Sequence, residues 1–170
     1  MEPVKQRLKN EGMREHPLTI QERVTLLEKS RLCSGLTNEQ LQSIAPYFDP
    51  FMAPTDSFVC REGDQSDFIC LVCSGRVAVA KQDHNNIRKI IATVGPGQTV
   101  GEMSVIDGGC RSASLMVQMP SLLLVLNADN FERMEEEVPR LWGKLLLQLA
   151  GMLSKRLRQT SGVLAEYLPA

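Results

Sequence analysis

The sequence predicts an α+β fold in which an antiparallel β-roll, jelly-roll-like and of about eight strands, is flanked by N-terminal helices and two C-terminal helices. Three observations predict it. Helix-capping signals occupy the first part of the chain, short β-rich runs fill residues 58–126, and apolar residues spaced by threes and fours follow. No crossover helix fits between the short runs, so a parallel α/β sheet is disfavoured.

Two capping boxes predict the N-terminal helices. Thr19 is followed three residues later by Glu22, and Thr37 is followed in the same way by Gln40. In this pattern the hydroxyl of the first residue accepts a hydrogen bond from the backbone N–H of the residue three later. The carboxylate or amide of that later residue accepts one from the backbone N–H of the first, and this pair of bonds marks the start of a helix. Apolar residues follow each box with helical spacing, and Pro46 ends the second helix or lies close to its end.

Short runs separated by turn residues predict the strands. The breaks are built from Gly, Pro, Asp, Asn and Ser, which favour tight turns. Many short strands with glycine-rich turns are typical of an antiparallel sandwich or roll. The predicted strands cover 58–61, 68–73, 76–81, 87–94, 113–118 and 122–126.

The chain after residue 126 returns to a helical pattern. Asp129, with Glu132 three residues later, has the form of a helix cap, and Pro139 can begin the last helix at its first turn. We therefore expect an N-terminal helical extension over 1–30 and one domain over 31–170. Within that domain the β-roll covers about 48–126 and the C-terminal helices cover about 127–160.

Composition limits the class of protein. A hydrophobic content of 43% allows a buried core, and a net charge of −1 leaves no broad basic surface for nucleic acid, so that any anion site must be local. The polar start of the chain does not resemble a secretory signal, and its longest apolar run is too short for a membrane span. Five cysteines, an odd number, favour reduced thiols in the cytoplasm.

The cysteines and histidines do not indicate a metal centre or an enzyme. Cys70 and Cys73 lie three apart in a predicted strand, where their side chains face opposite sides of the sheet, so we expect buried thiols without a metal or redox role. His16 and His84 have no partners at metal-ligand spacing. An enzyme on a similar roll, such as a cupin, usually needs a histidine-rich metal site, so we predict that the protein is not an enzyme.

The most informative segment is 100–114. Glu102 and Arg111 lie at its two ends, and between them we predict a helical turn over 102–106 and a turn over 107–109. An arginine together with the N–H groups of a helix start can bind a phosphate, and a carboxylate can accept a hydrogen bond from a sugar hydroxyl. The pair indicates a sensor of a phosphorylated sugar ligand. Taken singly, each could instead be a surface charge, with Arg111 paired to Glu102 or to Asp107.

The order of elements resembles that of the cyclic nucleotide-binding domain family, over roughly residues 32–157. Each matching motif is weak alone, but their order and spacing are specific. The motifs are Arg61-Glu62-Gly63-Asp64, Ser74-Gly75-Arg76-Val77, Gly95-Pro96-Gly97, Gly101-Glu102-Met103 and Arg111-Ser112-Ala113. Val100 and Cys70 stand where the family often has aromatic residues.

The resemblance implies a role for each residue of the segment, which is the phosphate-binding cassette in that family. Arg111 would bind the exocyclic phosphate oxygens together with the Ser112 hydroxyl and the Ala113 N–H, and Glu102 would accept from the ribose 2′-hydroxyl. Val79 and other apolar residues match positions near the sugar and base. The expected ligand-binding residues are Val79, Val100, Gly101, Glu102, Met103, Ser104, Arg111, Ser112, Ala113 and Arg156.

We therefore expect a stand-alone sensor of a cyclic nucleotide, with cyclic AMP favoured over cyclic GMP and no metal. The last helix, through Leu149, Met152, Leu153 or Arg156, would act as a lid that repacks and regulates an unknown downstream protein. Residues 159–170 are too few for a DNA-reading module, so we do not expect nucleic acid as a partner. Because the apolar runs are too short for a membrane span, we do not expect a membrane either. The alternative is an interaction or dimerisation module with a vestigial pocket, such as a homodimer through the last helix.

If Arg111 serves only to bind the ligand, one further prediction follows. Replacing Arg111 should then weaken ligand binding strongly and leave the stability of the free protein nearly unchanged.

Overall fold

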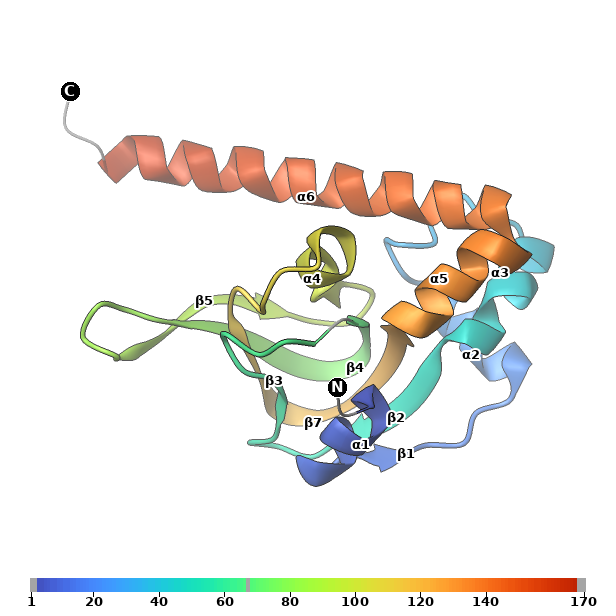
Figure 1. Cartoon of the computed structure of the whole chain (residues 1–170), viewed down its shortest axis with the longest axis horizontal. Helices are drawn as coiled ribbons and strands as arrows, with labels where there is room; N and C mark the ends of the chain where they lie inside the picture. Colours follow the sequence, from blue (N-terminus) through green and yellow to red (C-terminus); the bar gives the residue numbers. More distant parts are fainter. Residues whose placement is uncertain (1–2, 67, 168–170) are drawn as a thin grey trace.

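The structure, a computed structural model, describes residues 3–66 and 68–167 and confirms the predicted α+β class and β-roll (Figure 1). Its elements are α1 (Val4–Asn10), β1 (Arg14–Glu15), α2 (Ile20–Glu28), α3 (Asn38–Ile44), the 3₁₀ helix η1 (Ala45–Tyr47), β2 (Asp49–Ala53), β3 (Phe58–Cys60), β4 (Phe68–Gln82), β5 (Arg88–Val94), β6 (Thr99–Val100), α4 (Glu102–Asp107), β7 (Ser114–Asn127), α5 (Ala128–Glu137) and α6 (Pro139–Tyr167).

Both predicted capping boxes form and begin α2 and α3. The Thr19 hydroxyl accepts from the Glu22 N–H at 3.3 Å, and the Glu22 carboxylate accepts from the Thr19 N–H at 2.7 Å. Thr37 and Gln40 make the same pair of bonds at 3.3 and 3.1 Å. Pro46 lies in η1, directly after α3, where a helix-breaking residue was expected.

The described strands form one antiparallel sheet in the order β1-β2-β7-β4-β5, with β3 also paired to β7 and β6 to β4. Strands β4 and β7 each cover two of the predicted runs. The chain passes through Ser74-Gly75 and Met119-Pro120 with shifts of register instead of ending, because each strand remains hydrogen-bonded to the other. The very short β1 and β6 had no alternating pattern from which to predict them.

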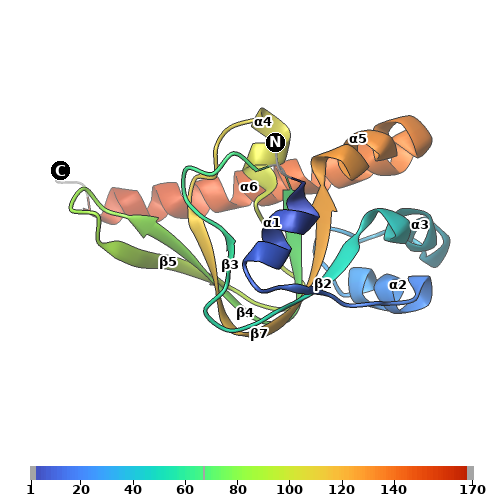
Figure 2. The same cartoon turned by 60° about the horizontal axis from the view of Figure 1, so that its bottom comes forward.

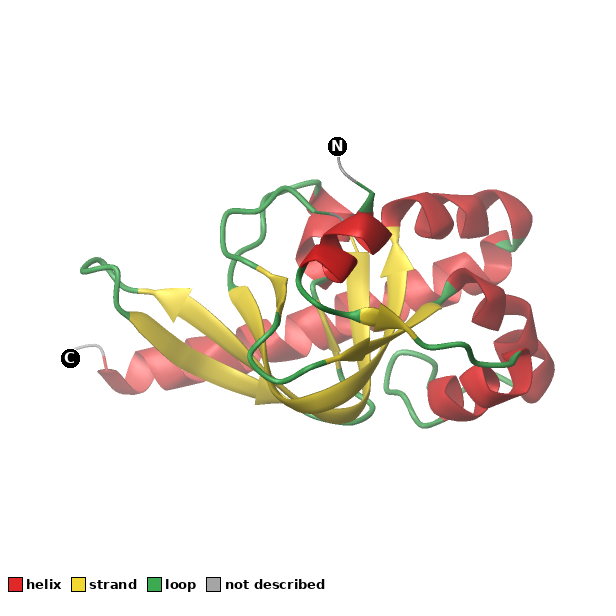
Figure 3. Ribbon diagram, turned by 90° about the horizontal axis from the view of Figure 1, so that it is seen from below, coloured by secondary structure: helices red, strands yellow, loops and turns green. Residues whose placement is uncertain are grey.

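The sheet separates two hydrophobic cores. Helices α2, α3, α5 and the first part of α6 gather at one end and cover one core, while the curled sheet and α1 enclose the other (Figures 2 and 3). Alternate residues of β4 face the two cores, so Cys70 lies inside the roll and Cys73 packs against the helical core, as predicted. Burial raises the pKa of Cys73 to about 12, so the thiol stays protonated.

The residue that caps helix α5 lies two residues before the predicted cap. The side chain of Asn127, the last residue of β7, accepts from the Asn130 N–H at 2.8 Å. The prediction that Asp129 caps this helix was therefore wrong, because asparagine caps a helix about as well as aspartate and the strand leads directly into it.

Helix α6 begins at Pro139, as predicted, and runs to Tyr167, ten residues past Leu157, where the apolar spacing that predicted it ends. Its Trp142 ring lies 5.7 Å from that of Phe131 on α5. Across the described ranges, no helix is both long enough and apolar enough to cross a bilayer.

The close approach of β4 to β7 at Gly75 can be tested by substitution. A Cβ on Gly75 would lie 2.2 Å from the Ser121 hydroxyl oxygen and 2.5 Å from the Pro120 carbonyl oxygen, whereas one on Gly35 would meet nothing within 4 Å. Their φ angles are +85° and +83°. We expect Gly35→Ala to lower the free energy of unfolding by about 1–2 kcal/mol through left-handed backbone strain alone, and Gly75→Ala to lower it further. Urea denaturation checks this, and equal losses would contradict the close contact.

Candidate functional site

A cavity of about 810 Å³ lies between the roll and the C-terminal half of α6, which runs above α4 and β5 in Figure 1. Its volume is within the range of small-molecule sites. All ten residues expected from the sequence line it, namely Val79, Val100, Gly101, Glu102, Met103, Ser104, Arg111, Ser112, Ala113 and Arg156. Their roles toward a ligand remain predictions.

Gly101 positions the start of α4 against Arg111. Strand β6 pairs with β4, which fixes the point where the chain turns into the helix. Gly101 caps α4 with φ +83°, and a Cβ there would lie 2.4 Å from the Arg111 Nη1 atom. Only glycine allows the guanidinium to lie this close to the backbone. At the other end, Gly108 ends α4 with φ +66°, in the predicted turn.

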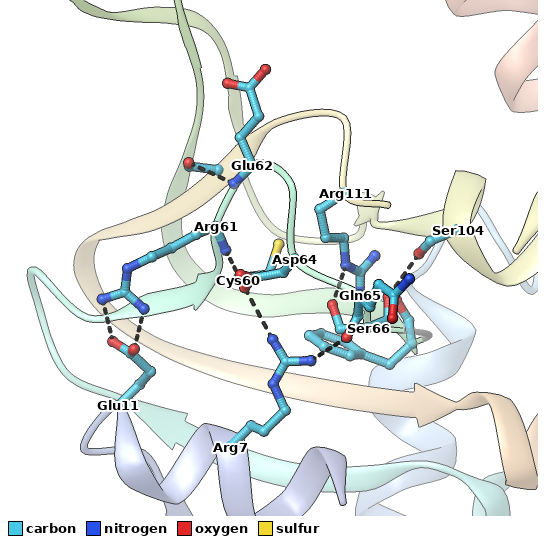
Figure 4. A network of polar contacts seen from close by, with 12 residues as sticks. Arg7, Glu11, Cys60, Arg61, Glu62, Asp64, Gln65, Ser66, Ser104 and Arg111 are labelled. Atoms are coloured by element: carbon cyan, nitrogen blue, oxygen red, sulfur yellow. Dashed lines mark hydrogen bonds and ion pairs between the residues drawn. The ribbon is translucent and has the colours of Figure 1, made fainter. Parts of the chain in front are cut away.

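Arg111 is buried, with 4% of its surface exposed, and joins several segments (Figure 4). Its Nε atom donates to the Ser66 hydroxyl at 2.8 Å, Nη1 to the Gly101 carbonyl at 2.7 Å and Nη2 to the Phe68 carbonyl at 2.8 Å. The guanidinium carbon also lies 4.2 Å from the centre of the Phe68 ring. Arg111 is therefore not a surface charge, and the described partner of Glu102 is a different arginine.

This environment changes one expectation from the sequence. Truncation of Arg111 would leave buried acceptors unsatisfied, which costs about 1–3 kcal/mol for each such group. The expectation that its replacement leaves the free protein nearly unchanged in stability disagrees with this geometry. We now expect Arg111→Ala to destabilise the ligand-free fold as well.

The segment 61–66, the bracing loop, is hydrogen-bonded to the backbone of Arg111 and to α4. The Asp64 carbonyl accepts from the Arg111 N–H at 2.9 Å, and the Gly63 N–H donates to the Arg111 carbonyl at 2.8 Å. The Ser104 hydroxyl of α4 donates to the Ser66 carbonyl at 3.0 Å. Main-chain and side-chain bonds therefore fix Arg111 to this loop.

Glu102 is almost completely buried, with 1% of its surface exposed. One carboxylate oxygen pairs with the Arg156 guanidinium, and the other, Oε2, has no hydrogen-bond partner among the described residues. Burial raises the pKa of Glu102, although the charges of Arg156 and Arg111 oppose this shift. A buried acceptor without a donor is costly, and a hydroxyl group of a ligand would satisfy it.

Polar contacts connect α6 to the corner between β6 and α4. Besides its pair with Glu102, Arg156 donates from Nη2 to the Thr99 carbonyl at 2.6 Å. The Thr99 hydroxyl in turn donates to the Met152 sulfur at 3.9 Å. The Arg156 side chain is 45% exposed, so this connection lies at the edge of the cavity.

The charges around the cavity favour an anion. Among its described lining residues, Lys81, Arg111 and Arg156 are cationic and Glu102 is anionic. Lys81 also donates to the Ser112 carbonyl at 2.8 Å, a contact that sequence reasoning missed because no motif marks this part of β4. Among residues 3–66 and 68–167, the cavity included, no group of three or more His, Cys, Asp or Glu side chains could hold a metal ion.

Part of the cavity lining was also missed. It includes Gln98 before β6 and the α6 residues Gln159, Thr160 and Val163. The apolar pair Val163 and Leu164 was the available signal that the last helix continues past Leu157.

The fold and this site define the class of protein, a β-roll ligand-binding domain. The model of the cyclic nucleotide-binding domain matches residues 52–137, half of the sequence, and the chain belongs to this family.

Similar proteins agree with this assignment. The chain is 29% identical over 133 residues to the Cyclic AMP receptor protein of Thermus thermophilus, and the aligned residues cover 78% of this chain and 60% of that protein. It is 32% identical over 110 residues to a cyclic nucleotide-gated potassium channel of Rhizobium etli, and the aligned residues cover 65% of this chain and 29% of the channel. The chain thus spans less than two thirds of these relatives.

A solved structure matches nearly the whole chain. The crystal structure of a cyclic nucleotide-binding domain from Methylobacillus flagellatus has a TM-score of 0.83 and 29% identity, and the match covers 93% of this chain and 90% of that one.

The raised pKa of Glu102 predicts a pH effect on stability. Because the folded state binds this proton more tightly than the unfolded chain, wild type should lose stability relative to Glu102→Gln as the pH rises from 4.5 through the folded-state pKa. Urea denaturation of both proteins over a pH series measures the difference. Glu135→Gln, at an exposed position on α5, is the control, and parallel profiles for wild type and Glu102→Gln would contradict the prediction.

Proposed function

We propose that the chain is a cytoplasmic sensor of a cyclic nucleotide, with cyclic AMP favoured, and that it regulates a downstream protein through its C-terminal helices. The observation that carries the proposal is that Glu102 and Arg111 line one cavity, between the family's β-roll and α6. The name of the Thermus relative supports cyclic AMP, and five cysteines without a disulfide bond fit a reducing compartment.

Each side of the cavity fits one part of such a ligand. Arg111, with Ser112 and Ala113, would bind the phosphate, where charge-assisted hydrogen bonds contribute about 1.5–3 kcal/mol each. The unpartnered Oε2 atom of Glu102 would accept from a ribose hydroxyl. Val79 and the neighbouring apolar residues would contact the sugar or base, and the negative phosphodiester would offset the excess of cations.

Arg156 supplies the connection between the pocket and α6. Because Arg156 and the ribose hydroxyl would both use the Glu102 carboxylate, a bound ligand changes the surroundings of the contact that holds α6 to the roll. The ligand can shift the position of α6 only to the extent that it binds the two arrangements with different affinities.

Isothermal titration with cyclic AMP and with cyclic GMP tests the proposal. We expect binding of at least one of them, and we expect Arg111→Lys, which keeps the charge but loses the forked geometry, to weaken it by roughly 10- to 100-fold. Arg76→Lys on the exposed side of β4 is the matched control. If folded wild-type protein gives no heat with either nucleotide, the sensor function is wrong.

A second candidate function is a dimerisation module, and the exposed part of α6 favours it. Leu157, Leu164 and Tyr167 are 68%, 57% and 81% exposed, and the two leucines lie seven residues apart. This is the spacing of a coiled-coil seam, and the same helix of a second copy would cover it.

The molar mass in solution decides this candidate. We expect wild type to be dimeric by light scattering, and Leu157→Glu combined with Leu164→Glu to be monomeric, because the charges would lie in the seam. Arg158→Glu, beside the seam, serves as the control. A monomeric wild type at all concentrations would exclude the homodimer.

A further inference from the structure

Helix α1 lies outside residues 52–137, the stretch that matches the family, yet it is fixed against the roll. Leu8 is 1% exposed and Met13, shortly after the helix, is 2% exposed, and both belong to the core inside the roll. Figure 2 shows α1 lying across the roll beside β2 and β3. The helix is therefore a firm support for any side chain that it presents to the site.

Arg7 is the residue of α1 that reaches the bracing loop (Figure 4). Its Nη2 atom donates to the Asp64 carboxylate at 3.0 Å, and its Nη1 atom donates to the Gln65 carbonyl at 2.6 Å. A second contact joins Glu11, just after α1, to the guanidinium of Arg61. The planar fork of Arg7 thus holds a side chain and a main-chain group of the loop in one arrangement.

Two residues of the loop, Asp64 and Ser66, connect this contact to Arg111. Asp64 accepts from Arg7 through its carboxylate and from the Arg111 N–H through its carbonyl, the latter at 2.9 Å. Ser66, two residues further, accepts from the Arg111 Nε atom at 2.8 Å. Displacement of the loop would therefore move both the backbone and the guanidinium of Arg111.

We propose that Arg7 is a positioning residue for Arg111, so that the N-terminal helix belongs to the phosphate-binding machinery although none of the residues of α1 lines the cavity. The proposal rests on the proposed function of the cavity. A site holds its productive geometry only when the groups around its binding residues are themselves fixed, and Arg7 supplies that fixation from outside the matched domain.

A purely structural role for Arg7, as an anchor of α1, predicts something different. The side chains of Arg7 and Asp64 are 24% and 29% exposed, and ion pairs of this kind contribute little to global stability. An anchor would change stability slightly and leave Arg111 in place. A positioning residue would change the order of Arg111 and the affinity for the ligand.

The experiment compares Arg7→Ala with Lys9→Ala in the full chain. Lys9 lies on the same helix and pairs with Glu15 at 2.7 Å, away from the loop, so both variants remove one positive charge from α1. We expect Arg7→Ala to weaken cyclic AMP binding in isothermal titration by roughly 3- to 30-fold, and Lys9→Ala to leave it unchanged. Cyclic GMP replaces cyclic AMP if it is the better ligand of wild type.

Nuclear magnetic resonance of the arginine Nε–H groups supplies a readout without ligand. The Arg111 signal, assigned by its loss in Arg111→Lys, should be protected from exchange with water in wild type and Lys9→Ala because it donates to Ser66. In Arg7→Ala we expect faster exchange of this signal, and in Arg7→Lys a partial return of protection and affinity. Asp64→Asn tests the same contact from the loop if Arg7→Ala fails to fold.

The outcomes separate this inference from the proposed function. Unchanged affinity and unchanged Arg111 exchange in Arg7→Ala would overturn the role of Arg7 while leaving the sensor intact. If wild type binds neither nucleotide, the sensor function fails, and the exchange measurement still decides whether Arg7 positions Arg111. Additive losses in a double-mutant cycle of Arg7→Ala with Ser66→Ala would also contradict the proposal, because residues acting through one loop should be coupled.

Discussion

The buried guanidinium of Arg111 is the interaction on which the rest of the site depends. It binds the bracing loop, the first residue of β4 and the residue before α4, so three segments distant in sequence meet at one side chain. Its planar array of donors suits this task as no other side chain does. Gly101 must be glycine because this group lies against it. The residue expected to bind the anion is thus also one that builds the ligand-free fold, so that mutations there affect stability and binding together.

Helix α6 is held in two different ways along its length. Its first half contributes the fully buried Leu145 and Leu149 to the helical core. Beyond Leu153 the residues of α6 are exposed, and the described contacts to the roll are the polar ones of Arg156 with Glu102 and the Thr99 carbonyl. Segments with few buried apolar contacts open at low cost in free energy. The second half of α6 is therefore the part best able to respond to the contents of the cavity.

Local signals made much of the fold predictable. The capping boxes at Thr19 and Thr37 and the proline at 139 act within one turn of helix, so their effects could be inferred from the sequence. The continuity of β4 through Gly75 could not, because pairing with β7 decides it. The ten cavity residues came from the resemblance to a family and not from spacing alone. Sequence reasoning missed Lys81, the fixation of Arg111 by Ser66 and the role of Arg7, because each depends on contacts between residues far apart in the chain.

Trp142 has a consequence beyond its packing against Phe131. It is the only tryptophan in the sequence, and it lies where α5 leads into α6. Its ring N–H is buried and has no hydrogen-bond partner among the described residues. The indole emission of the unlabelled protein therefore comes from this junction alone, and its wavelength reports whether water reaches the joint between the two helices.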